Sequence, residues 1–382
     1  MGGGILFVGH SPTFAALILG RIVQPATSTL LLVLFSAAVL ALLLTDAARR
    51  LALRLQWLDQ PGVGRVHKKP VPRIGGLAIF AAFAGILFAA IWLRDDLEFD
   101  TKILGLLLGA GLITLVMFID DVRGLPPLPK FLAQIAAAGV AIQFDIVIKF
   151  VRDPFGGGVS FPEWLALPLD NHIFFAGWLS ILITLFWIVG MMNAINFVDG
   201  YDGLAGGLSF IGAGVLFFLS LSLQQFSIAF LPLILAGAIL GFLPLNVYRA
   251  RIIMGDSGAH FLGFALGTIA IIGGAKLATT LLIFGVPAID VAWSIIRRTL
   301  QGGRFYQRDT GHLHHRLSEL GLPPLAIAVV YWSFSALFGA IALLLPTPLQ
   351  KIYALGILGI IVAALLVVLA RSGKGRLPPE LR

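Results

Sequence analysis

Apolar runs of close to twenty residues alternate along this chain with short polar connections. A helix needs about 20 apolar residues to cross the hydrocarbon core of a bilayer. Eleven runs of this kind are found, at residues 28–46, 75–93, 103–119, 131–149, 173–194, 204–222, 228–245, 258–274, 278–296, 324–345 and 351–370. The pattern predicts an all-α, polytopic integral membrane protein with about 11 transmembrane helices, because an open sheet would leave unpaired backbone groups in lipid.

The connections between the runs are too short to form a separate soluble domain. We therefore expect an N-terminal extracytoplasmic segment at residues 1–27, one membrane-embedded domain at residues 28–370 and a basic cytoplasmic tail at residues 371–382. The first segment has no basic stretch ahead of its weak apolar part, so a cleaved signal peptide is not expected.

Lysine and arginine are distributed unequally between the two sides that the alternating runs define. Of the 27 basic residues, 20 fall on one set of connections and on the C-terminal tail. The other seven are Arg21, Arg94, Lys102, Lys149, Arg152, Lys276 and Lys351. Because basic residues accumulate in cytoplasmic loops, we predict that the N-terminus lies outside and the C-terminus lies in the cytoplasm.

The composition supports a membrane protein and narrows the choice of partners. Hydrophobic residues make up 58% of the chain and charged residues only 12%, whereas a soluble domain carries about 25% charged residues. The net charge of +8 follows from the basic cytoplasmic connections and favours contact with anionic membrane lipid, so no nucleic-acid partner is expected. The chain has no cysteine, which excludes disulfides and thiolate chemistry.

Five polar clusters interrupt the apolar pattern. Because each apolar run crosses the membrane once, the number of runs between the clusters places all five on the cytoplasmic side. Polar loop residues without a shared role would fall on both sides. The clusters are residues 66–76, Asp120-Asp121 with Lys130, residues 193–203, residues 246–258 and residues 297–320. Their common side predicts one functional site assembled from distant parts of the chain.

The third cluster has the clearest geometry. Asn196, Asp199 and Asp202 follow one another at intervals of three residues, and residues at that spacing share one face of a helix. Carboxylates beside hydrocarbon are costly and indicate function. A simpler interpretation also exists, because aspartates often cap helices and residues 255–258 could form only a turn ahead of the eighth run.

Carboxylates, amides and basic residues on one membrane face are the groups that phosphoryl transfer requires. Mg²⁺ prefers carboxylate oxygens, water and substrate phosphates as ligands, and basic residues bind phosphate oxygens. A metal ion on a diphosphate stabilises the departing nucleotide. The clusters therefore predict phosphoryl transfer from a nucleotide to a lipid at the cytoplasmic membrane surface.

In their order and residues, the five clusters resemble those of the polyprenyl-phosphate N-acetylhexosamine-1-phosphate transferases (glycosyltransferase family 4) over roughly residues 57–320. Two features resemble the undecaprenyl-phosphate N-acetylglucosamine-1-phosphate transferase branch: Leu313 interrupts the histidines, and residues 68–76 match that branch. The resemblance implies transfer of N-acetylglucosamine-1-phosphate from a UDP-sugar to undecaprenyl phosphate, with release of UMP. The expected place is the cytoplasmic face of the bacterial inner membrane, at the start of cell-surface glycan synthesis such as that of O-antigen. Some members of this family use another UDP-N-acetylhexosamine, so a different donor sugar stays open. Members also commonly form homodimers, so the resemblance implies a homodimer here.

The resemblance also implies roles for individual residues. The implied catalytic residues are Asp120, Asp121, Asp199 and Asp256, with one acid of the first pair as a general base. The implied ligands of Mg²⁺, or alternatively of Mn²⁺, are Asn196, Asp256 and Asp121. The expected substrate-binding residues are His67, Lys130, Asp202, Asn246, His312, His314, His315 and Arg316.

Two functions of other classes remain open. A secondary transporter also places acids at broken helices, but near the bilayer midplane, whereas these clusters lie at helix ends on one side. A membrane lipid diphosphatase would use the same acids to activate water. Transfer of label from a UDP-sugar into a lipid product separates a transferase from both.

Overall fold

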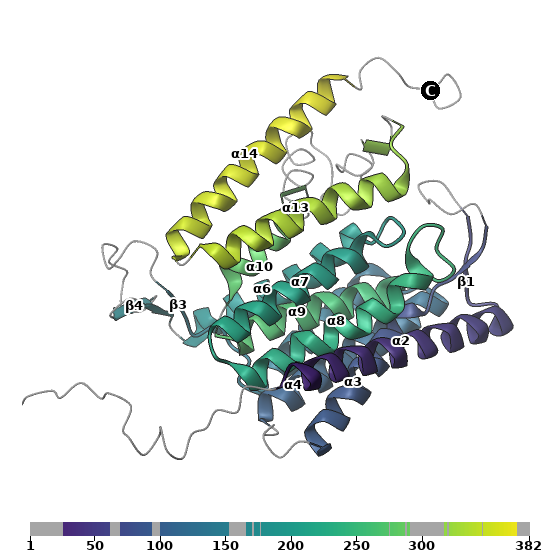
Figure 1. Ribbon diagram of the computed structural model, residues 1–382, viewed down its shortest axis with the longest axis horizontal. Helices are drawn as coiled ribbons and strands as arrows, with labels where there is room; N and C mark the ends of the chain where they lie inside the picture. The colour runs from purple at the N-terminus through teal and green to yellow at the C-terminus, as the bar shows by residue number, and fades with distance from the viewer. Residues whose placement is uncertain are drawn as a thin grey trace, which may run out of the picture.

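The computed structural model describes residues 26–61, 69–93, 100–152, 166–169, 172–175, 177–274, 276–286, 289–290, 317–318, 321–345 and 347–372. Most of these residues are helical, and the long helices lie side by side in one bundle (Figure 1). In chain order the helices are α2 (Thr27–Leu55), α3 (Gly75–Leu93), α4 (Thr101–Arg123), α5 (Pro127–Gln143), α6 (Gly177–Val198), α7 (Leu204–Ser222), α8 (Phe226–Asn246), α9 (Gly255–Ile272), α10 (Leu277–Ile283), α13 (Pro324–Leu344) and α14 (Pro348–Ser372).

Among the described residues, eight helices are long and apolar enough to cross a membrane. They are α2, α3, α4, α6, α7, α8, α9 and α13. The prediction of a largely helical, polytopic membrane protein is therefore confirmed. The predicted runs at residues 75–93 and 204–222 coincide with α3 and α7 from end to end.

Most other predicted runs differ from the helices only in their end residues, but two of them are not helical throughout. The run at residues 131–149 corresponds to α5, which already ends at Gln143, and Asp145 then takes a left-handed φ of 60°. The run at residues 173–194 starts as a strand, because the aromatic and β-branched residues of His172–Phe175 pair in a sheet before α6 begins at Gly177. The run at residues 278–296 is described only for α10 and for residues 284–286 and 289–290, and its remainder lies outside the described residues.

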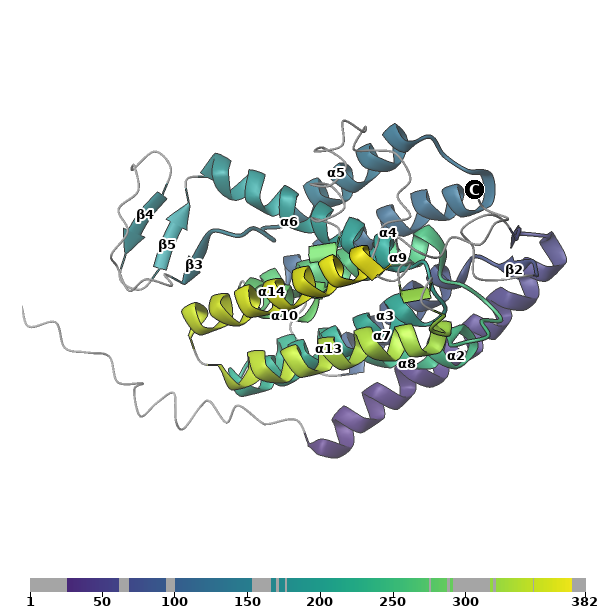
Figure 2. The ribbon, with the colours of Figure 1, turned by 90° about the horizontal axis from the view of Figure 1, so that it is seen from above.

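Two small antiparallel sheets lie at opposite ends of the bundle and were not part of the all-α prediction (Figure 2). At one end β1 (Leu58–Asp59) pairs with β2 (Val71–Pro72), with Leu58 opposite Pro72. At the other end β5 (His172–Phe175) lies between β3 (Phe150–Arg152) and β4 (Ala166–Leu169). Both sheets lie at ends of the bundle, which agrees with the rule that open strand edges are not found in the hydrocarbon region.

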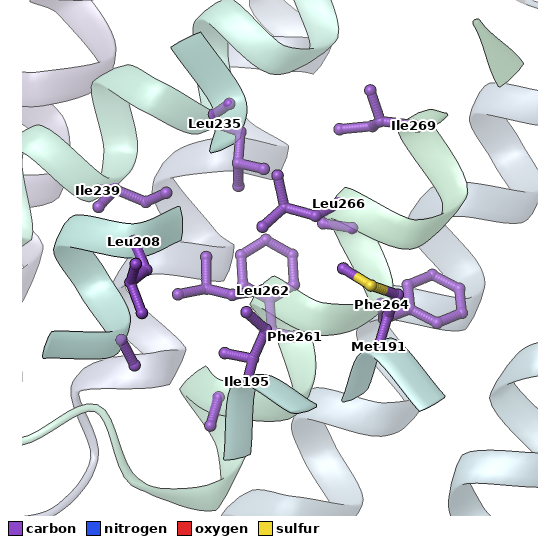
Figure 3. Close-up of a cluster of buried hydrophobic side chains, with 14 of the residues drawn as sticks. Met191, Ile195, Leu208, Leu235, Ile239, Phe261, Leu262, Phe264, Leu266 and Ile269 are labelled. Carbon is purple, nitrogen blue, oxygen red and sulfur yellow. The ribbon is translucent and has the colours of Figure 1, made fainter. Parts of the chain in front are cut away.

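Helix α9 forms the centre of the core. Nearly every residue of α9 is buried, including the large side chains of Phe261 and Phe264. Figure 3 shows this helix between α6, which contributes Met191 and Ile195, and side chains of α7 and α8. Because α9 is enclosed on all sides, its first turn is held in the middle of one end of the bundle.

The chain runs back and forth, so alternate helix ends meet at the end that carries β1 and β2. The Ile253 amide donates to the Pro72 carbonyl at 2.9 Å, and the Gly76 amide donates to the Met254 carbonyl at 2.9 Å. These bonds join the start of α3 to the start of α9. The described parts of four predicted polar clusters therefore lie at this one end.

Candidate active site

The last turn of α4 and the first turns of α5 and α9 meet at the β1–β2 end of the bundle. One carboxylate oxygen from each of Asp120, Asp121 and Asp256 can be chosen so that all three lie within 4.8 Å of one another. Asp120 and Asp121 end α4, whereas Asp256 is the second residue of α9. Residues 135 positions apart in sequence thus form one acidic centre, as the sequence predicted.

Asp120 is positioned by the turn that follows α4. Gly124 ends this helix with a φ of 71°, and its amide donates to the Asp120 carbonyl at 2.8 Å. The Leu125 amide donates to Asp120 Oδ1 at 2.6 Å, which leaves Oδ2 to face the site. Pro127 then starts α5, where a residue without an amide proton is well suited to the first helical position.

Asp121 holds the N-terminus of α9 from a different helix. Its Oδ1 accepts from the Asp256 amide at 2.8 Å, and its Oδ2 accepts from the Ser257 amide at 3.0 Å and from the Ser257 hydroxyl at 2.6 Å. Amides in the first helical turn have no partner within the helix, so this wholly buried carboxylate acts as their cap. The capping interpretation thus holds for this segment, but the cap is Asp121 and Asp256 remains available to the site.

Glycines make this close approach possible. Gly255 has a φ of 71°, and a Cβ there would lie 2.5 Å from Asp121 Oδ2 and 2.6 Å from the Arg73 carbonyl. Gly76 of α3 lies against the backbone of Gly258, with no room for a side chain between them. The two helices therefore touch through their backbones directly beside the acids.

Arg73 connects three of the acids. Its Nε donates to Asp121 at 3.0 Å, its Nη2 to Asp256 at 2.7 Å and its Nη1 to Asp59 of β1 at 3.3 Å. A planar guanidinium suits this arrangement because its donors have fixed, divergent directions. The sequence pattern placed Arg73 in the first polar cluster, but it gave neither Arg73 nor Asp59 an individual role in the site.

Lys130 closes the other side of the acidic centre. Its Nζ donates to Asp120 Oδ2 at 2.7 Å and to Asp256 Oδ2 at 2.5 Å. The side chain of Lys130 is 26% exposed and that of Asp256 is 14% exposed, so both can be reached from solvent. The predicted role of Lys130 in substrate binding stays a prediction.

Asp199, in the connection between α6 and α7, lies beside this centre. Burial and the nearby charge of Asp256 raise the pKa of Asp199 well above its usual 3.8, and Arg73, Asp121 and Asp202 also act on it. Its carboxyl forms no hydrogen bond with the described residues. Within the described part of the chain, the other three acids of the centre are held by hydrogen bonds, and Asp199 is placed beside them by the connection alone.

Asp202 and Asn246 form hydrogen bonds with backbone groups of two neighbouring connections. Asp202 Oδ2 accepts from the Ala250 amide at 3.0 Å. Asn246 accepts from the Gly203 amide at 3.1 Å and donates to the Ile252 carbonyl at 3.1 Å. These bonds join the connection before α7 to the connection before α9. The predicted role of both residues in substrate binding stays a prediction.

Several predicted site residues lie outside the described residues. They are His67, His312, His314, His315 and Arg316. Asn196 is described, in the last turn of α6, three residues before Asp199, and its role as a metal ligand stays a prediction.

The donor set of the acidic centre fits a hard divalent cation. Four carboxyl groups, those of Asp59, Asp120, Asp121 and Asp256, bond to the two basic side chains of Arg73 and Lys130, and Asp199 lies beside them, so acids outnumber bases among the described residues. Carboxylate oxygens at this spacing are the ligands that Mg²⁺ prefers. A divalent cation would balance the excess.

Comparison with known proteins agrees with this site. The model of glycosyl transferase family 4 matches residues 103–274, which include the acidic centre. A probable undecaprenyl-phosphate N-acetylglucosaminyl 1-phosphate transferase of Bacillus subtilis is 33% identical over 80% of this chain and 81% of its own length. A decaprenyl-phosphate N-acetylglucosaminephosphotransferase of Mycolicibacterium smegmatis is 33% identical over 92% of this chain and 91% of its own length. A phospho-N-acetylmuramoyl-pentapeptide-transferase of Staphylococcus aureus is 30% identical over 82% of this chain and 97% of its own length. This chain belongs to glycosyl transferase family 4.

Proposed function

We propose that this protein transfers N-acetylglucosamine-1-phosphate from UDP-N-acetylglucosamine to undecaprenyl phosphate, giving the lipid diphosphate sugar and UMP. The proposal rests on one observation: three acids meet two basic side chains at one end of a membrane bundle. They are Asp120, Asp121 and Asp256 with Arg73 and Lys130. The names of the relatives in Bacillus subtilis and Mycolicibacterium smegmatis support a polyprenyl phosphate acceptor and this sugar phosphate.

The reaction joins two anionic substrates at the acidic centre. An oxygen of the lipid phosphate forms a bond to the β-phosphorus of the UDP-sugar, while the bond from that phosphorus to the oxygen of UMP breaks. The lipid phosphate is largely dianionic near neutral pH, so it needs little help from a base. Positioning and charge neutralisation then supply most of the catalysis.

The side chains of the site divide this work between them. Lys130, held by two carboxylates and partly exposed, would turn toward the incoming phosphate and reduce the repulsion between the substrates. Arg73 stays in place, because three acids bind its guanidinium, and it keeps Asp256 pointed at the site. Mg²⁺ bound by Asp256 with Asp120, Asp121 or Asn196 would supply positive charge to the diphosphate and the departing UMP.

We further propose that the protein lies in the bacterial inner membrane with about eleven spans, the N-terminus outside and the C-terminus in the cytoplasm. The 20 basic residues on the side of the polar clusters support this orientation. It gives the site access to a water-soluble UDP-sugar, while the polyprenyl tail stays among the lipid chains. Pairing into a homodimer, which the family resemblance implies, stays a prediction.

Transfer of label tests the proposal against its rivals. Purified protein is incubated with undecaprenyl phosphate, Mg²⁺ and UDP-N-acetylglucosamine labelled both in the sugar and in the β-phosphate. We expect both labels to enter the organic phase, with one UMP released for each molecule of lipid product. With Asp256→Asn, neither label should enter the organic phase. Hydrolysis without lipid product would favour a diphosphatase, whereas movement of intact UDP-sugar across vesicles without UMP release would favour a transporter.

The choice of donor is tested in the same assay. UDP-N-acetylgalactosamine and UDP-N-acetylmuramoyl-pentapeptide are supplied in parallel at equal concentration, because one relative is a pentapeptide transferase. The proposal expects the highest kcat/KM with UDP-N-acetylglucosamine. A higher kcat/KM with either alternative would keep the reaction but change the assigned donor.

A further inference from the structure

A second layer of polar side chains lies beneath the acidic centre, among residues that are otherwise apolar. It consists of Gln134 on α5, Asn193 on α6 and His260 on α9. Gln134 is 4% exposed and His260 is 1% exposed. Buried polar side chains between membrane helices are costly and usually serve a function, and the proposed reaction does not yet use these three.

Each of the three lies one helical turn from a residue of the site. Gln134 follows Lys130 by four residues, His260 follows Asp256 by four residues, and Asn193 precedes Asn196 by three residues. Residues at these spacings lie one above the other on a helix. The bond between Lys130 and Asp256 and the bond between Gln134 and His260 are therefore successive links between α5 and α9.

The shorter hydrogen bonds of this layer run in one direction, from Asn193 to the Asp256 carbonyl, and only a longer bond of 3.5 Å from Gln134 Nε2 to Asn193 Oδ1 runs the other way. Nδ1 of His260 lies 2.8 Å from the Asp256 carbonyl, which can only accept, so Nδ1 carries the proton. Nε2 of the neutral ring must then accept from Gln134 Nε2 at 3.0 Å. The remaining oxygen of Gln134 accepts from Asn193 Nδ2 at 2.8 Å, and the same amide group donates to the Val189 carbonyl at 2.8 Å.

The chain of bonds fixes the backbone of Asp256 itself, because it ends on the Asp256 carbonyl. Apolar side chains of similar volume would pack three helices equally well, but they would allow one helix to slide along another. A directional set of hydrogen bonds permits one register only, and polar side chains that fix register in this way are well attested.

We propose that His260, Gln134 and Asn193 are positioning residues that set the register of α5, α6 and α9, so that Asn196 and Asp256 meet at the bound cation and Lys130 is held beside them. This inference rests on the proposed function. It states that the placement of the metal ligands depends in part on a layer of residues that touches neither substrate nor metal. Removal of such supporting hydrogen bonds typically weakens metal affinity by about 10- to 100-fold.

The test measures Mn²⁺ binding to the purified full-length protein by electron paramagnetic resonance, without nucleotide or lipid. Gln134→Met and His260→Leu remove the bonds at nearly constant volume, and Asn193→Ala removes only the last member. Leu266→Ala on the same helix is the matched control, because this buried leucine packs away from the site and its loss lowers stability alone. Melting temperatures are recorded for every variant.

We expect the Mn²⁺ dissociation constant to rise about 10- to 100-fold in Gln134→Met and in His260→Leu, and by a smaller factor in Asn193→Ala. The double variant of Gln134 and His260 should bind Mn²⁺ no more weakly than the weaker-binding single variant. Either single change already breaks the same series of hydrogen bonds. Leu266→Ala should melt at a lower temperature but bind Mn²⁺ as the wild type does.

Unchanged Mn²⁺ affinity in folded Gln134→Met, or in Asn193→Ala if Gln134→Met does not fold, would overturn the inference while leaving the proposed function intact. The same loss of affinity in Leu266→Ala would also overturn it, since any loss of stability would then suffice. If the wild type shows no Mn²⁺ binding that Asp256→Asn abolishes, the proposed metal site itself fails, and the inference fails with it.

Discussion

Because α3 and α9 touch through their backbones beside the acids, we expect Gly76→Ala to lower both the stability and the activity of the protein. A Cβ at residue 76 would overlap the backbone nitrogen of Gly258 and would lie only 2.6 Å from the Ser257 carbonyl carbon. Ordinary contacts of this kind begin near 3.4 Å, so the two helices must separate by roughly 1 Å. Overpacking of this kind costs about 1–3 kcal/mol.

The separation would also strain the backbone bonds that join the two helix starts. The Gly75 amide donates to the Ile253 carbonyl at 3.1 Å, and the Gly76 amide donates to the Met254 carbonyl at 2.9 Å. Each bond contributes about 1 kcal/mol. Together with overpacking, and less about 1 kcal/mol gained from the helix propensity of alanine, we expect a net loss of about 2–4 kcal/mol in the free energy of unfolding.

Activity should fall further than stability. A shift of about 1 Å at a catalytic group can lower the rate by about 100-fold, and the moved helix carries Asp256. The matched control is Gly85→Ala, also in α3, where a Cβ would meet Leu40 at an ordinary 3.6 Å. This control should keep full activity and gain up to about 1 kcal/mol from helix propensity.

The assay combines thermal unfolding in detergent micelles, followed by tryptophan fluorescence, with label transfer at saturating Mg²⁺. Both variants are compared with wild-type protein prepared in the same way. If Gly76→Ala matched Gly85→Ala in melting temperature and in turnover, the backbone contact between α3 and α9 would have no role in positioning the site.

Three further predictions concern charge and pH. Arg73→Lys should lose at least one of its three carboxylate partners, because a single ammonium does not reproduce the guanidinium fork. We expect about 100-fold lower turnover and a lower melting temperature, whereas Arg49→Lys, in a local surface pair with Asp46, should match the wild type. Since the pKa of Asp199 is raised above 3.8 in the folded protein, the unfolded chain loses this proton first as the pH rises, and folding stability falls. Asp199→Asn should therefore melt higher than the metal-free wild type at pH 7, and the difference should vanish near pH 4; a difference that grew toward pH 4 would contradict this sign. Burial lowers the pKa of Lys276 from 10.5 to about 8. The unfolded chain therefore binds this proton more tightly than the folded protein, so the buried charge lowers folding stability at pH 7. Lys276→Met should gain about 2 kcal/mol at pH 7, after about 1 kcal/mol is subtracted for the lost hydrogen bond to Ser220, and the gain should disappear above pH 10.5; thermal melts at pH 7 and pH 10.5 decide this.

Much of the fold was accessible from the sequence because lipid imposes a simple rule on helices. Apolar length alone placed α3 and α7 to the residue. It failed where an apolar run contains two kinds of structure, as at His172–Phe175, whose side chains favour a strand. Hydrophobicity cannot separate a strand from a helix over so few residues.

The site was predictable to the extent that its groups interrupt apolar sequence. Asp120, Asp121 and Asp256 stand out at helix ends, and their common side predicted their meeting. Arg73 was missed because a basic residue at a cytoplasmic helix end already had an explanation in topology. Gln134 and His260 were missed because their partners lie on other helices, and no local pattern reveals such pairing. The spacing of four residues from Lys130 and from Asp256 was the one available signal.

The proposed mechanism requires acids from distant parts of this chain to bind a single divalent cation at one end of the membrane bundle. Anomalous scattering from Mn²⁺ in crystals of the protein tests it directly. We predict one strong peak bounded by the carboxylates of Asp120, Asp121 and Asp256, which disappears in Asp256→Asn. A protein that is active with Mn²⁺ but shows its peak elsewhere, or the same peak in Asp256→Asn, would contradict the account.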